Sequence, residues 1–156
     1  MLANSHLTAI TRKGPSAPCR WLHKQGRIEA PVLDWGCGKG ADRAFLDGNH
    51  VYAVGYDPHY RPKKPLPELR FKTILCTYVL NVIPEYHDRC AVIGEALEYL
   101  DDGGWLYVTI RCNQKDLNGY TQRGTWQGYV GEQLEVGGFT LIRKLADYEI
   151  WGWQKK

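Results

Sequence analysis

The residues of this sequence that could do chemistry gather first in the stretch VLDWGCGKGADRAFL, from Val32 to Leu46. Three glycines stand at alternate positions, Gly36, Gly38 and Gly40, between an apolar run and a helix-like segment. Glycine lets the backbone pass close to a ligand because no Cβ intervenes, and a helix N-terminus offers free N–H groups and a positive dipole end. The stretch therefore predicts a cradle for a cofactor, and a tight turn without a ligand is the alternative.

Two carboxylates indicate which cofactor this cradle would hold. Asp34 precedes the first glycine by two residues, where a dinucleotide site expects an apolar residue, although GCGKGA itself fits the dinucleotide fingerprint. A carboxylate there suits a cofactor with a cationic amino-acid end, such as S-adenosylmethionine, which carries an ammonium and a sulfonium. Asp57 could accept the two ribose hydroxyls of either cofactor. Asp34 therefore favours S-adenosylmethionine over a nicotinamide dinucleotide.

These residues need strands and helices to position them, and the hydrophobic pattern predicts both. Helices are expected over 16–25, 39–48, 84–100 and about 127–135, and the sequence DDGG at 101–104 should end the third of them. Strands are expected over 30–36, 51–56, 71–77, 105–111, 137–147 and 148–154. The proline-rich stretch 58–70 is expected to be a loop. This order predicts an α/β fold with a mainly parallel sheet and an antiparallel C-terminal strand pair.

Length and composition bound the remaining possibilities. The 156 residues predict one domain, with an N-terminal arm and short helix over 1–28 and an α/β core over 29–156. Scattered cysteines and histidines predict free thiols and no metal site. No run approaches the roughly 20 apolar residues of a membrane span, and no apolar leader is recognised. We therefore expect a cytoplasmic protein, in a bacterial cell or an infected host cell, that has no membrane partner.

The net charge of +3 is small, but the basic residues are unevenly distributed. The segments 1–31 and 58–72 each contain five Lys or Arg side chains and one Glu. Such segments indicate an anionic partner, with nucleic acid among the possibilities, and two solvated loops are the alternative. The sequence makes no prediction of the oligomeric state.

Several stretches resemble class I S-adenosylmethionine-dependent methyltransferases. LDWGCGKG followed by VGYD is similar to that family's first motif and acidic second-strand end. ILCTYVLNVIP followed by DDGGWLYVTI resembles its fourth strand, helix and fifth strand, and the last two expected strands resemble its antiparallel end. The resemblance covers 30–154 and implies a Rossmann-like fold of about six strands. The sheet would be reduced, because the proline-rich stretch replaces the usual third strand.

The resemblance also implies which residues hold S-adenosylmethionine and, after the reaction, S-adenosylhomocysteine. Asp34 and the glycines would line the methionine end, Asp57 would hold the ribose, and Thr77 and Tyr78 would lie beside the sulfonium. Pro58 or His59 would flank the adenine. The complete set implied to bind the cofactor is Asp34, Gly36, Cys37, Gly38, Gly40, Asp57, Pro58, Thr77 and Tyr78.

Methyl transfer is an in-line displacement, so the protein has mainly to align the reactants and exclude water. A general base helps only where the acceptor is a poor nucleophile. Tyr78, Asn81 and His59 are the catalytic candidates, and His6 could join them from an arm that folds over the cofactor. The alternative for each histidine is a surface or packing role.

Three functions remain open on this evidence. Methyl transfer to a small-molecule or nucleotide acceptor is the leading one. The second is a nucleic-acid methyltransferase or the catalytic part of a DNA-modification complex, because HLTAITRKGPSAPCR, GYDPHYRP and YVLNVIPE resemble the DNA phosphorothioation-associated methyltransferase group. Against it, TYVLNVIPE lacks the N/D-P-P-Y/F/W tetrapeptide of amino-methylating DNA enzymes. The third is a non-catalytic S-adenosylmethionine-binding subunit, and a nicotinamide oxidoreductase is least favoured.

Overall fold

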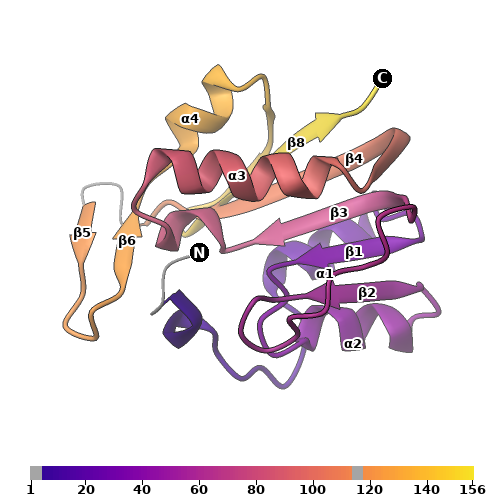
Figure 1. Cartoon of the computed structure of the whole chain (residues 1–156), viewed down its shortest axis with the longest axis horizontal. Coiled ribbons are helices and arrows are strands. Elements are labelled where there is room, and N and C mark those ends of the chain that lie inside the picture. Colours follow the sequence, from indigo (N-terminus) through magenta and orange to yellow (C-terminus); the bar gives the residue numbers. More distant parts are fainter. Residues whose placement is uncertain (1–4, 114–117) are drawn as a thin grey trace.

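Figure 1 shows the computed structural model of the chain, which describes residues 5–113 and 118–156. A six-stranded sheet with the order β2-β1-β3-β4-β8-β7 forms its centre. The first four strands of that order are parallel, and β8 is antiparallel to both β4 and β7. The strands are β1 (Val32–Trp35), β2 (Ala53–Tyr56), β3 (Phe71–Thr77), β4 (Leu100–Arg111), β7 (Thr140–Lys144) and β8 (Tyr148–Gln154). This arrangement confirms the predicted α/β fold and its antiparallel C-terminal pair.

The sheet ends at β2, as expected from the proline-rich stretch that follows it. Residues 58–70 form no strand of the sheet, and the backbone of Asp57 pairs only with Arg61 in an isolated antiparallel bridge. Proline removes a backbone donor and fixes φ, so four prolines in this stretch prevent a regular ladder. The reduced, six-stranded form of the Rossmann-like sheet is therefore confirmed.

Helices cover both faces of the sheet. Helices α1 (Ala17–Lys24) and α2 (Ala41–Gly48) bury Cys19, Leu22 and Leu46 against one face. Helices α3 (Tyr86–Leu97) and α4 (Gly131–Val136) bury Val92 and Leu134 against the other. Short 3₁₀ turns, η1 (Ser5–Thr8) and η2 (Leu80–Val82), lie in the arm and after β3. None of the helices in the described residues has the length and apolar character needed to cross a membrane.

Helix α1 matches the expected span of 16–25 because its end signals are local. The hydroxyl of Ser16 accepts the N–H of Cys19 and so caps the helix, while Pro18 occupies the first turn. Gln25 is the C-terminal cap, and Gly26 follows it with φ +69°. These residue types favour those positions in isolated helices, so the sequence alone defines the helix.

The third helix, predicted over 84–100, is shorter at both ends in the structure. Helix α3 begins at Tyr86, after Glu85 as its cap, and ends at Leu97. Leu100 belongs to β4, where it is fully buried and paired with Phe71. The DDGG stretch lies inside β4 as an irregularity of the register: Gly103 has φ +77°, and a Cβ at Gly104 would lie 2.8 Å from the carbonyl oxygen of Lys72. Burial of Leu100 therefore outweighs the helical spacing.

The helix predicted over 127–135 was wrong in its first half. Trp126–Gly128 is strand β6, which pairs with β5 (Asn118–Tyr120) in a separate two-stranded sheet, and α4 starts only at Gly131. The turn is closed by Thr121 and Thr125, whose hydroxyls lie 2.6 Å apart, with Gly124 at φ +74° between them. A glycine in the left-handed region of a short loop is a hairpin signal that the helical pattern concealed.

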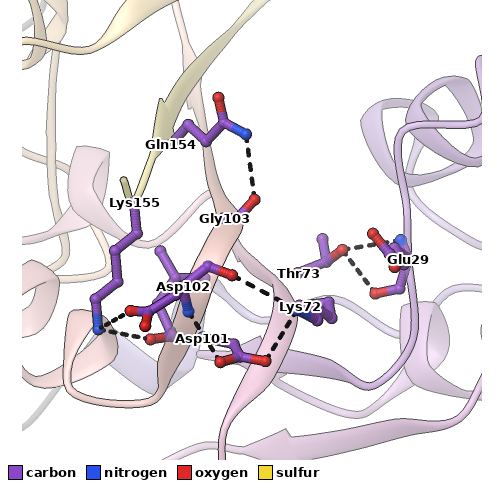
Figure 2. Close-up of polar contacts among 9 residues, drawn as sticks. Glu29, Lys72, Thr73, Asp101, Asp102, Gly103, Gln154 and Lys155 are labelled. Atoms are coloured by element: carbon purple, nitrogen blue, oxygen red, sulfur yellow. Dashed lines mark hydrogen bonds and ion pairs between the residues drawn. The ribbon is translucent and has the colours of Figure 1, made fainter.

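Polar contacts fasten the end of the sheet that lies away from the carboxyl ends of the parallel strands, as Figure 2 shows. The hydroxyl of Thr73 accepts the Glu29 N–H at 2.9 Å and donates to the Glu29 carbonyl at 2.8 Å. Three further pairs are Lys72–Asp101, Lys155–Asp102 and Gln154–Gly103. Thr73 is 1% exposed, whereas the ion pairs are partly in solvent, so the threonine contributes most of the stabilisation.

We therefore expect Thr73→Val to lower the free energy of unfolding by about 1–2 kcal/mol, because two hydrogen bonds of a buried hydroxyl are lost without a change of shape. Urea titration followed by circular dichroism measures the change. The matched control is Lys72→Met, which removes only a solvent-screened ion pair and should move the midpoint much less. Equal effects of the two substitutions would contradict this assignment.

Candidate functional site

A cavity of about 330 Å³ lies at the carboxyl ends of the parallel strands. This is the edge of an open α/β sheet where ligands bind. All the residues singled out from the sequence border it, whether proposed for the cofactor or for catalysis. They are His6, Asp34, Gly36, Cys37, Gly38, Gly40, Asp57, Pro58, His59, Thr77, Tyr78 and Asn81. The structure thus brings the candidates together, while their individual roles remain predictions.

The glycine turn follows β1, and its residues have different reasons to be glycine. Gly36, Gly38 and Gly40 all have positive φ, of +87°, +54° and +87°. A Cβ at Gly36 would overlap the side chain of Val79, whereas a Cβ at Gly38 would meet only Ala9 at an ordinary 3.5 Å. Gly36 is therefore required by the close approach of two strand ends. Gly38 is required by its backbone conformation.

Asp34 is a buried carboxylate at the wall of the cavity. It lies on β1, between β2 and β3, is 2% exposed, and borders the cavity. Its carboxylate has neither a hydrogen bond nor an ion pair to any residue of 5–113 or 118–156. Burial, together with the negative charges of Asp42 and Asp57, raises its pKa well above the ordinary value, and the charge of Arg12 only partly opposes this. Such a carboxylate favours a cationic ligand.

Asp57 lies directly after β2 and is already engaged by the backbone. Its Oδ2 accepts the N–H of Gly38 at 3.0 Å, and its Oδ1 accepts the N–H groups of His59 and Tyr60 at 2.9 and 3.0 Å. The carboxylate therefore joins the glycine turn to the loop after β2. A carboxylate has about four lone-pair sites, so it can still accept a hydroxyl group of a ligand in the cavity.

Two other side chains of the cavity keep their protons at neutral pH. Burial and the charges of Asp34 and Asp57 raise the pKa of the Cys37 thiol to about 12. Burial raises the pKa of the Tyr78 phenol to about 12 as well, against the lowering effect of Arg111. Tyr78 can therefore donate a hydrogen bond but does not act readily as a base, and Cys37 is not a thiolate nucleophile.

Tyr78 occupies a strained position at the end of β3. Its φ is +59°, in the left-handed region, and its N–H donates to the carbonyl of Thr109 on β4 at 2.9 Å. Non-glycine residues in this region are uncommon and concentrate at functional sites. The strained backbone of Tyr78 therefore lies at the cavity, which its ring borders.

The N-terminal arm forms one wall of the cavity. The ring of His6 stacks on that of His59 with centroids 3.9 Å apart and an interplanar angle of 13°. The hydroxyl of Tyr60 donates to the His6 carbonyl at 3.4 Å, and the Lys39 ammonium donates to the Thr11 hydroxyl at 3.0 Å. The arm is thus held against both the loop after β2 and the glycine turn.

A buried contact anchors the far end of this arm. Asp42, in the first turn of α2, accepts the backbone N–H of Ser16 at 2.6 Å and its hydroxyl at 2.8 Å. Because Ser16 also caps α1, one carboxylate ties the start of α1 to the start of α2. Asp42 itself borders the cavity.

Sequence reasoning missed several polar residues of the cavity, among them Arg12, Asp42, Arg111 and Gln127. Arg111 is the last residue of β4, so the rule that ligands bind at strand carboxyl ends could have found it. Gln127 lies on β6, within the segment expected to be helical, and no local signal placed it. Among residues 5–113 and 118–156, no cluster of three or more potential metal ligands occurs.

The sequence matches the protein family described as "Methyltransferase domain" over residues 10–144. This span contains the glycine turn, both carboxylates and the residues after β3. No match is found among curated proteins.

Solved structures with this fold have low sequence identity. One is the 1,6-didemethyltoxoflavin-N1-methyltransferase of Burkholderia thailandensis, with S-adenosylhomocysteine bound (TM-score 0.68, 18% identity, 90% of this chain and 77% of that chain). Another is the CcbJ methyltransferase of Streptomyces caelestis (0.67, 15%, 98% and 95%). A third is the glycopeptide N-methyltransferase MtfA, complexed with S-adenosylhomocysteine (0.66, 11%, 99% and 97%).

At these identities the structural likeness establishes the fold, and the family match covers most of the sequence. The cradle for a cofactor lies where that fold places its ligands. The chain therefore belongs to the methyltransferase domain family.

Proposed function

We propose that this enzyme transfers the methyl group of S-adenosylmethionine to a small-molecule or nucleotide acceptor bound in the same cavity. The observation that carries the proposal is the buried Asp34 carboxylate, which borders the cavity and lacks a cationic partner in the described part of the chain. Burying an unpaired charge is costly, and a ligand with an ammonium group offsets that cost. The Asp34 carboxylate therefore fits a cofactor that carries an amino-acid group.

Each element of the turn has a function in this proposal. Asp34 holds the ammonium group, and the backbone at Gly36 and Gly38 allows close approach of the methionine portion. Asp57 accepts a ribose hydroxyl while it keeps its bonds to the turn and to the loop after β2. The arm, through His6, excludes water from the same cavity.

Bound S-adenosylmethionine supplies a methyl carbon made electrophilic by its sulfonium. The acceptor's lone pair forms the new bond to this carbon, the carbon–sulfur electron pair stays on sulfur, and a proton leaves the acceptor. Imidazole suits proton transfer near neutral pH, so we assign the acceptance of that proton to His59 or His6, directly or through water. Tyr78, whose pKa is raised to about 12 by burial, donates a hydrogen bond instead.

The small-molecule assignment is supported by the dimensions and the walls of the cavity. About 330 Å³ is at the lower end of the range, roughly 300–1,000 Å³, that holds small ligands. The arm also lies over the cavity, which leaves less room for a polymer.

The first test is calorimetric titration of the purified protein with S-adenosylmethionine, S-adenosylhomocysteine and NADH. We expect the first two to bind with micromolar affinity and NADH not to bind. Radiolabelled methyl transfer to DNA, RNA and metabolite fractions then separates the acceptor classes. Tight cofactor binding without transfer to any fraction would favour a non-catalytic subunit and contradict the proposal.

Asp34→Asn should make the free protein more stable at pH 7 by about 1–3 kcal/mol, because the unpaired buried charge is removed. Since its pKa is higher in the folded protein than in the unfolded chain, Asp34 costs stability as pH rises through that interval, and the variant should lose this pH dependence. Thermal unfolding between pH 4 and 8 measures both effects. Asp47→Asn, on the exposed side of α2, is the control.

The same variant should bind S-adenosylhomocysteine at least about tenfold more weakly, as expected for a lost charged hydrogen bond. It should bind 5′-methylthioadenosine, which lacks the amino-acid portion, as the parent protein does. Asp57→Ala should weaken the binding of both compounds. Unchanged affinity of Asp34→Asn for S-adenosylhomocysteine would remove Asp34 from the methionine end.

In the parent protein, the affinity for S-adenosylhomocysteine should fall as pH drops through the raised pKa of Asp34, because only the ionised carboxylate attracts the ammonium group. The titrations are repeated between pH 5 and 8. Asp34→Asn should show a flat profile over this interval, and an equally steep profile in both proteins would assign the effect to another group.

A further inference from the structure

Two arginine side chains border the cavity beside Tyr78. The guanidinium carbon of Arg111, at the end of β4, lies 4.5 Å from the centre of the Tyr78 ring. The guanidinium carbon of Arg12, in the arm, lies 5.7 Å from the same centre. All three residues border the cavity, so two positive charges converge on one aromatic ring beside the expected position of the methyl group.

Neither guanidinium is neutralised by a neighbouring carboxylate. Within residues 5–113 and 118–156, Arg12 and Arg111 form no ion pair. Asp34 and Asp147 influence this region through their charges only. Two unpaired guanidiniums that border a partly enclosed cavity form a binding site for a carboxylate or phosphate group.

A second feature of the same cavity concerns Asn81 in η2 and Gln127 on β6. The Asn81 amide donates to the Gln127 side-chain oxygen at 3.2 Å. The Asn81 side-chain oxygen is buried and has no hydrogen-bond partner among the residues that the structure describes. It belongs to a residue that is 1% exposed and borders the cavity. Buried acceptors without partners are rare in folded proteins. An N–H or O–H group of a ligand in the cavity would provide the missing donor.

From these two observations we propose that the methyl acceptor is a small organic anion that also carries a hydrogen-bond donor. Its carboxylate or phosphate group lies between Arg12 and Arg111, and its N–H or O–H group donates to Asn81. This inference rests on the proposed function and names the substrate class of the same site. Asn81 is a binding residue here, because an amide cannot take up the acceptor's proton.

The charges that border the cavity limit the choice of acceptor. Asp34 and Asp57 provide negative charge for the ammonium and sulfonium groups of the cofactor, and Arg12 and Arg111 provide positive charge beside Tyr78. The two guanidinium groups favour an anionic acceptor over a cationic one.

The test compares matched anionic and neutral probes on the protein saturated with S-adenosylhomocysteine. The pairs are AMP with adenosine, CMP with cytidine, and 4-hydroxybenzoate with 4-hydroxybenzamide, at constant ionic strength because such attraction is screened by salt. Inorganic pyrophosphate serves as a minimal anion. We expect at least one anion to bind about tenfold or more tightly than its neutral partner.

Arg111→Met should abolish this preference while affinity for S-adenosylhomocysteine stays within about twofold. Arg12→Met should also abolish the preference, but it should weaken S-adenosylhomocysteine as well, because the charge of Arg12 helps to keep Asp34 ionised. The matched control is Arg143→Met, because Arg143 also stacks on an aromatic ring, Trp21 at 4.6 Å, on another part of the molecule. It should retain the preference. Asn81→Leu should weaken 4-hydroxybenzoate more than benzoate, without lowering the unfolding temperature.

Four other outcomes have distinct meanings. Failure to bind S-adenosylhomocysteine would overturn the proposed function itself. Normal cofactor binding with equal affinity for charged and neutral probes, or with no binding of any anion, would overturn the inference and leave the cofactor site intact. A preference that survives both arginine substitutions would also overturn it. Binding of a single-stranded oligonucleotide that is much tighter than that of AMP would replace the small anion by nucleic acid.

Discussion

The rest of the site depends on a carboxylate that is buried between two parallel strands of the sheet. Asp34 lies on β1, between β2 and β3, and its neighbours in the register are Gly55 and Leu75. Nothing in the described part of the chain neutralises it fully, and Asp42 and Asp57 add to the negative potential. An apolar residue at this position would stabilise the fold. The chain instead carries an energetic cost that a cationic ligand can relieve, as expected where function opposes stability.

Three further features are consequences of placing that carboxylate at a strand end. The backbone must leave the sheet sharply without covering it, so Gly36 lies where a side chain would overlap Val79. Asp57 then fixes the turn through the N–H of Gly38. Asp42 holds the start of α1, and thereby the arm, close to the same edge. Asp42 and Asp57 therefore hold the backbone through hydrogen bonds, and they also add negative electrostatic potential to the cavity.

The sequence predicts the parts of this site that depend on local signals. Strand ends and helix starts are recognisable from residue types alone. They are enough to predict the glycine turn with Asp34 at the end of one strand, and Asp57 at the end of the next. The hairpin β5–β6, in which Tyr120 pairs with Trp126, was missed because the helical spacing of the following residues concealed the loop signal at Gly124. Gln127 was lost with it. Arg12 was recognised as part of a basic segment, but its position over Tyr78 depends on how the arm folds back.

The N-terminal arm contacts the cavity both at the loop after β2 and at the end of β3. His6 contacts the loop that follows β2, whereas Arg12, farther along the same segment, contacts the ring that follows β3. Ser16 anchors the C-terminal end of the same segment on Asp42. A chain with a net charge of only +3 therefore presents a negative wall from its sheet and a positive wall from its arm and β4. The local arrangement of charge, rather than its sum, decides which ligands the cavity accepts.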